Sequence, residues 1–77
     1  MKERIKEIMS AVFGIKCEEI SNDASTDTCE NWDSLNHMNL IVAIEEEFSI
    51  RFLDDEIIKL NNLEALENRI QEFLSKD

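Results

Sequence analysis

The 77-residue sequence has no proline, no tyrosine and a single glycine, Gly14. Because proline and glycine interrupt regular structure most strongly, their scarcity favours a chain that is helical along most of its length. The sequence also lacks the run of about 20 apolar residues that a membrane-spanning helix needs, and it has no secretory leader pattern. We therefore expect a cytoplasmic protein without a membrane span.

Cationic residues are also scarce, because 8 Lys and Arg stand against 18 Asp and Glu, for a net charge of -10. This charge argues against binding to nucleic acid or to an anionic membrane surface, since both need cationic partners. It favours a protein partner with a basic face. With 77 residues the chain has room for one domain, which we expect to span residues 1–77 and to be monomeric.

The sequence offers little for catalysis or metal binding. Cys17 and Cys29 do not form a CxxC pair, and no set of Cys and His has the spacing of a zinc site. The single histidine, His37, has no evident acid or nucleophile as a companion, and there is no glycine-rich phosphate loop. These features favour a non-catalytic carrier or binding protein with free thiols and no metal site.

Apolar residues recur at helical spacing and predict three main helices and one short helix. The first spans Lys2 to about Phe13, where Gly14 would end it. The second spans about Ser34 to Phe48, a short turn covers about Asp54 to Lys59, and the last helix spans about Leu63 to Leu74. The expected fold is all-α: a small four-helix bundle with a long loop between helices one and two.

The segments around the second helix also follow recognisable patterns. Residues 15–33 are predicted to form the long loop, since Ser, Thr, Asn and Asp crowd it and compete for backbone hydrogen bonds. Its expected anchors in the core are Ile15, Ile20 and Trp32. Asn61 and Glu64 resemble a capping box at the start of the last helix. The buried stripe of that helix is expected to comprise Leu63, Leu66, Ile70, Phe73 and Leu74.

The second helix carries two apolar faces. Successive residues turn by about 100° around a helix axis, so two sets of apolar residues fall on nearly opposite sides. The face expected in the core comprises Leu40, Ile41, Ala43, Ile44 and Phe48. The opposite strip comprises Leu35, Met38 and Val42, and it is flanked by Glu45 and Glu46. Either this helix touches neighbours on both sides, or the strip is a docking surface with an acidic rim.

Ser34 opens the second helix. A serine at a helix start is ordinarily an N-cap, but Asp33 precedes it and can cap in its place. The charge of Asp33 also suits the positive end of the helix dipole. Because the free N–H groups of a helix start favour an attached phosphate, Ser34 is a candidate attachment point as well as a candidate cap.

Two motifs carry a resemblance to a known family: Asp33-Ser34-Leu35 and Ile44-Glu45-Glu46-Glu47-Phe48. The chain resembles the acyl carrier protein family, in which a D-S-L tripeptide opens an acidic second helix that ends in a run like L-E-E-E-F. The resemblance covers nearly the whole chain. It implies that a transferase moves 4′-phosphopantetheine from coenzyme A to the Ser34 hydroxyl, between Asp33 and Leu35. The thiol of the arm would then hold acyl or aminoacyl groups as thioesters.

The resemblance also implies partners. They are a phosphopantetheinyl transferase, acyl- or aminoacyl-ligases, and acyltransferases or synthases with basic docking faces. The positions that match the family's recognition surface are Met38, Val42, Glu45, Glu46, Asp54 and Asp55.

Several residues depart from the family pattern. Asn36, Asn39 and Arg51 stand where the family usually has acidic residues. We therefore expect a specialist carrier of a dedicated biosynthetic pathway rather than the housekeeping fatty-acid carrier. Trp32 is expected to pack the loop, and His37 to be a partly buried structural residue or a contact for one partner.

Two alternatives stay open. The chain could be a helical protein-interaction domain that is never modified. A calcium-binding loop is a weaker alternative, because Asp23, Ser25 and Asp27 have the first three ligand spacings of an EF-hand. Thr28 and Ser34 then occupy the positions where that loop needs Gly and Glu.

Overall fold

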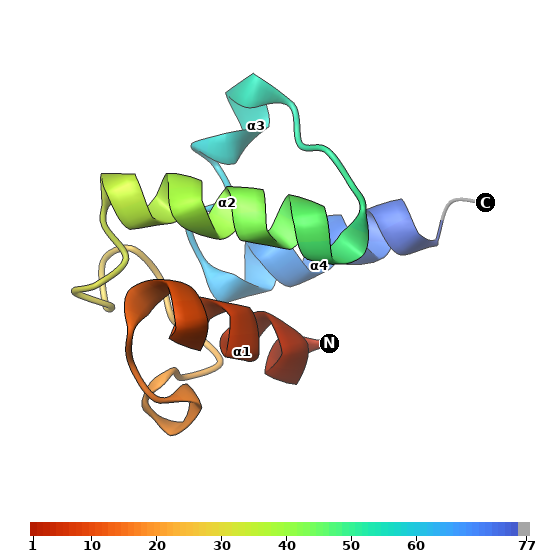
Figure 1. Ribbon diagram of the computed structural model, residues 1–77. Helices are drawn as coiled ribbons and strands as arrows, with labels where there is room; N and C mark the ends of the chain where they lie inside the picture. Colours follow the sequence, from red (N-terminus) through yellow and green to blue (C-terminus); the bar gives the residue numbers. More distant parts are fainter. Residues whose placement is uncertain (76–77) are drawn as a thin grey trace.

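The chain folds into helices joined by loops, and the computed structural model describes residues 1–75 (Figure 1). The α-helices are α1 (Lys2–Phe13), α2 (Ser34–Phe48), α3 (Asp54–Ile57) and α4 (Leu63–Leu74), and a 3-10 turn, η1 (Cys17–Glu19), lies in the long loop. The predicted all-α class and the bounds of the three main helices are confirmed. The short helix ends earlier than predicted, at Ile57.

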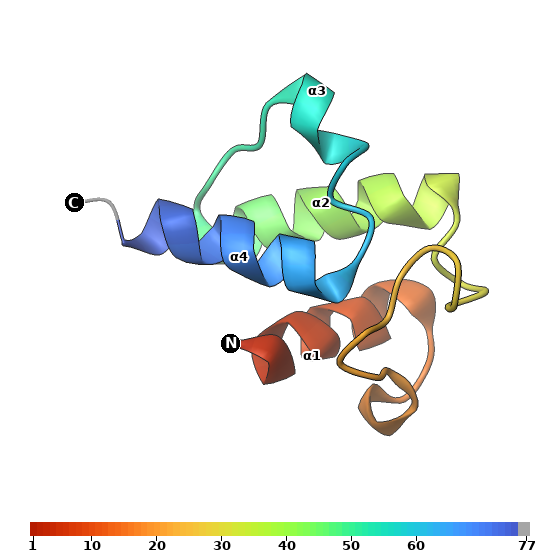
Figure 2. The same cartoon turned by 180° about the vertical axis from the view of Figure 1, so that it is seen from behind.

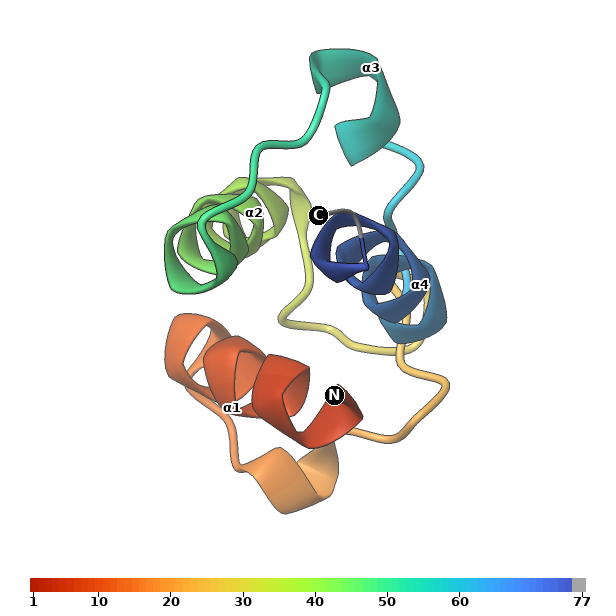
Figure 3. The same ribbon diagram turned by 90° about the vertical axis from the view of Figure 1, so that its right-hand side faces the viewer.

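Among the long helices, α1 packs most closely on α2 and also contacts α4. Seen end-on in Figure 3, α2 and α4 lie beside each other, with α1 on one side of the pair and α3 on the other. Figure 2 shows the same arrangement from behind, with α4 toward the viewer. The fully buried side chains come from all three long helices and include Ile5, Met9, Leu40, Ile44, Leu63, Leu66 and Ile70. One core therefore holds the long helices, and α3 lies at its edge.

Two helices end in the left-handed region of backbone space. Gly14 has φ 72°, and its N–H donates to the Ser10 carbonyl, so the predicted glycine end of α1 is confirmed. Ser49 closes α2 with φ 56°, where a side chain is strained and glycine is the usual residue. Phe52 then donates its backbone N–H to Oε2 of Glu45 at 2.9 Å, which holds the segment after α2 against that helix.

The start and the buried stripe of α4 differ from the prediction. Asn62, not Asn61, is the N-cap, since its Oδ1 accepts the N–H of Ala65 at 2.8 Å. The carbonyl of Asn61 accepts the N–H of Thr26 instead, so the predicted capping box of Asn61 and Glu64 is wrong. Leu74 was also placed wrongly, because it is 46% exposed in the last turn. The rest of the predicted stripe is buried or, at Phe73, half-buried.

The long loop is fastened at several points. Ile20 and Trp32 are buried and Ile15 is half-buried against the core, so the three predicted anchors are confirmed. Ala24 is a fourth anchor that the sequence did not single out, and its carbonyl accepts the N–H of Leu63 at 2.9 Å. The loop therefore joins the entry into α4 as well as the entry into α2.

Within residues 1–75, no helix is both long enough and apolar enough to cross a membrane. The thiols of Cys17 and Cys29 are free, and both residues are half-buried.

We predict that Leu66→Ala lowers the free energy of unfolding by about 2–5 kcal/mol, since it truncates a fully buried side chain. Leu74→Ala makes the same chemical change on the same helix at an exposed position, and it should cost less than about 1 kcal/mol. Urea unfolding of both variants measures the difference. Equal losses would contradict the placement of the core along α4.

Candidate functional site

Ser34 is the first residue of α2 and is exposed. Asp33 performs the capping, because its Oδ1 accepts the N–H of Asn36 at 2.9 Å. The Asp33 carbonyl also accepts the N–H of His37 at 2.7 Å. Among the hydrogen bonds of residues 1–75, none uses the Ser34 hydroxyl. The hydroxyl is therefore accessible and uncommitted at the positive end of a 15-residue helix.

Two contacts fix the segment that leads into α2, one made by Trp32 and one made by Asn36. Trp32, 2% exposed, packs against Phe13 with ring centroids 5.8 Å apart. Nδ2 of Asn36 donates to the carbonyl of Asn31 at 2.8 Å, which ties the first turn of α2 back to the loop. Sequence reasoning treated Asn36 only as a lost acidic residue. Its backbone contact gives it a structural role beside Ser34.

His37 connects three segments. The indole Nε1–H of Trp32 donates to Nδ1 of His37 at 2.9 Å, and Nε2 of His37 lies 2.7 Å from the carbonyl oxygen of Ile57 in α3. An indole N–H can only donate, so Nδ1 must accept and Nε2 must carry the proton that it donates to Ile57. The imidazole is therefore neutral in this arrangement. The predicted structural role of His37 is confirmed, and so is the packing role of Trp32.

A groove of about 550 Å³ lies beside Ser34, between the start of α2, the long loop and the end of α3. Its lining residues are Thr26, Trp32, Asp33, Ser34, His37, Met38, Ile57, Ile58 and Asn61. The groove therefore brings three predicted site residues together, Asp33, Ser34 and Met38. The other lining residues are the apolar Trp32, Ile57 and Ile58 and the polar Thr26, His37 and Asn61.

The second apolar strip of α2 faces outward. Leu35 is 74% exposed, Val42 is 50% exposed, and Met38 between them is exposed as well. The alternative in which this strip packs on another helix is therefore excluded. Leu53 and Ile58, which flank α3, are exposed apolar residues as well, and Ile58 is 79% exposed. Sequence reasoning missed both, because α3 is too short to show a helical repeat.

The predicted acidic rim is only partly available. Glu45 is half-buried, and one of its oxygens accepts the Phe52 N–H. Glu47 forms an ion pair with Arg4 of α1. Glu46 is exposed and belongs to none of the ion pairs within residues 1–75. Asp54 and Asp55 are exposed in the first turn of α3. The carboxylates open to a partner are therefore chiefly those of Glu46, Asp54 and Asp55.

Glu56 ties α3 to α4. Its Oε1 accepts from Nε of Arg69 at 2.6 Å, and its Oε2 accepts the backbone N–H of Leu53 at 2.7 Å. Arg69 also lies 4.3 Å above the ring of Phe73. The Arg69 guanidinium, with the Leu53 N–H in support, holds the pKa of the Glu56 carboxyl below its ordinary value, although partial burial opposes this.

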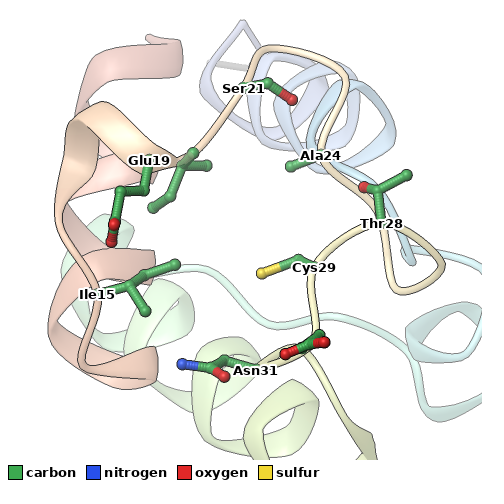
Figure 4. Close-up of a pocket in the computed structure, with 9 residues that line it drawn as sticks. Ile15, Glu19, Ser21, Ala24, Thr28, Cys29 and Asn31 are labelled. Atoms are coloured by element: carbon green, nitrogen blue, oxygen red, sulfur yellow. The ribbon is translucent and has the colours of Figure 1, made fainter.

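A second hollow, of about 300 Å³, lies in the long loop (Figure 4). The side chain of Cys29 points into it, and Ile15, Glu19 and Ala24 line its walls. None of its lining residues belongs to α2 or α3, so this hollow is separate from the groove beside Ser34.

The comparisons with known proteins agree with this geometry. Residues 3–70 match the family described as phosphopantetheine attachment site. The chain is 42% identical over 64 residues to an acyl carrier protein of Buchnera aphidicola subsp. Schizaphis graminum (strain Sg), covering 83% of this chain and 81% of that protein. It is also 42% identical over 71 residues to acyl carrier proteins of Buchnera aphidicola subsp. Acyrthosiphon pisum, strains Tuc7 and 5A, covering 92% of this chain and 89% of each relative. The matched range includes all of α2.

We predict that Glu56→Gln removes part of the pH dependence of stability. The folded-state pKa of Glu56 is lowered, so its ion pair contributes fully above the ordinary pKa of 4.5 and is lost as the pH falls through the folded-state value. Urea unfolding between neutral and acidic pH measures this effect. The variant should be less stable than wild type at pH 7, and the two should converge once the pH falls below the folded-state pKa of Glu56.

Glu46→Gln is the control for this prediction, because it removes the same charge from an exposed residue outside the ion pairs. It should follow the wild-type pH profile in shape. Parallel profiles for Glu56→Gln and wild type would contradict the stabilising role of the ion pair.

Proposed function

Because the chain belongs to the acyl carrier protein family, whose members are non-catalytic carriers with a covalent 4′-phosphopantetheine arm, we propose that Ser34 bears this arm. The observation that carries the proposal is that Asp33 and Ser34 have separate roles at the start of α2. Asp33 caps the helix, and the neighbouring Ser34 hydroxyl is exposed and uncommitted. A serine needed as the cap would lose its helix contact on modification, whereas Ser34 does not.

The residues around Ser34 fit a phosphopantetheine group. Its phosphodiester would lie near the free N–H groups at the start of α2, where the helix dipole favours negative charge. Asp33 and Leu35 flank the attachment point, and the groove between α2 and α3 begins at Ser34 itself. When bound, the arm supplies a thiol that holds acyl or aminoacyl groups as thioesters. The chain supplies the position of the arm and a surface that partner enzymes read.

We propose that partners dock on the exposed strip of α2 and on the start of α3. Leu35, Met38 and Val42 would form the apolar centre, and Glu46, Asp54 and Asp55 the acidic rim. One oxygen of Glu45 already accepts the N–H of Phe52, so Glu45 can offer a partner only its remaining hydrogen-bonding capacity. Rim charges accelerate encounter more than they strengthen the complex, which suits a shuttle that must bind and leave quickly. The matching partners are a phosphopantetheinyl transferase and ligases, acyltransferases or synthases with basic faces.

We further propose that the carrier serves a dedicated pathway. The surface carries less negative charge than is usual in the family, because acidic residues are replaced by Asn36, Asn39 and Arg51. The side chain of Asn36 instead donates a hydrogen bond to the loop. Enzymes that require acidic residues at these positions should bind this carrier poorly. The single domain over residues 1–77, the monomeric state and the cytoplasmic location stay predictions. An unmodified helical interaction domain is the alternative, and the mass of the modified protein distinguishes it.

We predict that co-expression with a broad-specificity phosphopantetheinyl transferase adds the mass of one phosphopantetheine to the chain, and that Ser34→Ala abolishes this increase. Ser21→Ala is the control, because Ser21 is an exposed serine of the long loop. Intact-mass spectrometry measures the masses of wild type and of both variants after co-expression. An unmodified wild type, or a modified Ser34→Ala variant, would overturn the assignment of Ser34.

We predict that Glu46→Lys slows modification by the transferase on the order of 10-fold at low salt, because it reverses a charge beside the docking strip. The effect should shrink as salt screens the rim. Glu18→Lys makes the same charge change on η1, which lies on the far side of α1 from α2 (Figure 3). Similar rates for the two variants would contradict a docking surface on α2.

A further inference from the structure

His37 spans the interface between α2 and α3. It lies one turn after Ser34, and its Nε2 donates to the Ile57 carbonyl at 2.7 Å. The same carbonyl accepts the N–H of Leu60 at 3.2 Å, so the histidine bond is anchored at the end of α3. This hydrogen bond joins α2 to α3, so the two helices cannot separate at this point without breaking it.

Both ring nitrogens of His37 are already used. Nδ1 accepts from Trp32, which leaves no lone pair for a cargo group, and the Nε2 proton is committed to Ile57. His37 therefore cannot act as an acid, a base or a hydrogen-bonding site for cargo while these bonds are in place. Its role is to position α3 and Trp32 relative to α2.

His37 and Ile57, which this hydrogen bond joins, both line the groove beside Ser34. Its inner wall is formed by Trp32 and Ile57, which are both buried. Both belong to the core cluster that also holds Leu40 and Leu63, which have no exposed surface. The pair of Glu56 and Arg69 fastens α3 from the other side, so α3 cannot swing away without losing polar contacts. The bond between His37 and Ile57 therefore joins α2 to α3 at this groove.

We propose that His37 is a positioning residue that sets which cargo stays at the surface: its bond to Ile57 latches α3 onto α2 and keeps short or polar acyl groups out of the core. This inference rests on the proposed attachment at Ser34. A longer alkyl chain gains more from burial with each methylene, so the latch sets a minimum length for entry rather than an absolute barrier. The preferred cargo is then a short acyl or aminoacyl group that remains accessible to partner enzymes.

Two nearly isosteric variants separate the two bonds of His37. In His37→Gln, the side-chain amide nitrogen can take the place of Nε2 and keep the bond to Ile57. In His37→Asn, the shorter side chain can take the place of Nδ1 and keep the bond from Trp32, but it cannot reach α3. Both variants retain a polar side chain, so a difference between them reports the latch and not the loss of the residue.

The experiment loads wild type and both variants with acyl-phosphopantetheine from coenzyme A thioesters of increasing alkyl length, confirms loading by intact mass, and measures cleavage of each thioester by hydroxylamine. Cleavage should become slow at a shorter alkyl length in His37→Asn than in wild type and His37→Gln. At that length, the loss of one hydrogen bond should make cleavage about five-fold slower in His37→Asn. Identical length profiles in all three proteins, or protection of the shortest chains in wild type, would overturn the proposal.

A second measurement uses the unmodified protein. Hydrogen exchange of the Lys59 and Leu60 amides, which bond to carbonyls of α3, should be about five-fold faster in His37→Asn than in His37→Gln. Unchanged exchange would show that no latch exists, whatever the loading result. If exchange responds but no arm is attached, the assignment of Ser34 is wrong and the cargo inference falls with it.

Discussion

The burial of Trp32 is the contact on which the candidate site depends. The indole packs on Phe13 at the end of α1 and donates to His37 in α2, so it fixes the last residues of the loop against two helices. With Trp32 inside, Asp33 is placed to cap α2, and Ser34 follows on the outside. A large aromatic side chain supplies enough buried area to hold a loop that is otherwise rich in polar residues. The exposure of Ser34 thus follows from the burial of Trp32 two residues earlier and the capping by Asp33 one residue earlier.

α3 is positioned by polar contacts more than by its own stability. Its four residues fall far short of the roughly 12–15 that an isolated helix needs in water. Glu56 joins it to Arg69 of α4, His37 joins it to α2, and the Glu45 carboxylate holds the segment that leads into it. Only Ile57 within α3 is buried. The wall of the groove that faces Ser34 is therefore held by these polar contacts and by the burial of Ile57, and not by the helix itself.

The sequence predicts the long helices well because their apolar repeats are long, and the bounds of α1, α2 and α4 agree with the structure. The proposal that Ser34 is the attachment point came from a motif at a helix start. One error lies where a long-range contact decides between similar residues: Asn62 caps α4, whereas the Asn61 carbonyl bonds to Thr26, far away in the sequence. The partners of His37 were out of reach for the same reason, since Ile57 lies 20 positions further on. Spacing along the chain can locate a histidine on a helix face, but it cannot say which carbonyl meets it.

The two faces of α2 place opposite demands on one helix. Leu40 and Ile44 must stay in the core to hold α1 and α4, whereas Leu35 and Val42 expose apolar surface that contributes nothing to folding. Such a strip on a small domain would promote self-association if it were uncharged. A net charge of -10, with open carboxylates at Glu46, Asp54 and Asp55, makes two copies repel each other and leaves a basic partner as the favoured occupant. The charge therefore permits the apolar strip to remain exposed, and it directs the same strip to partners of the opposite sign.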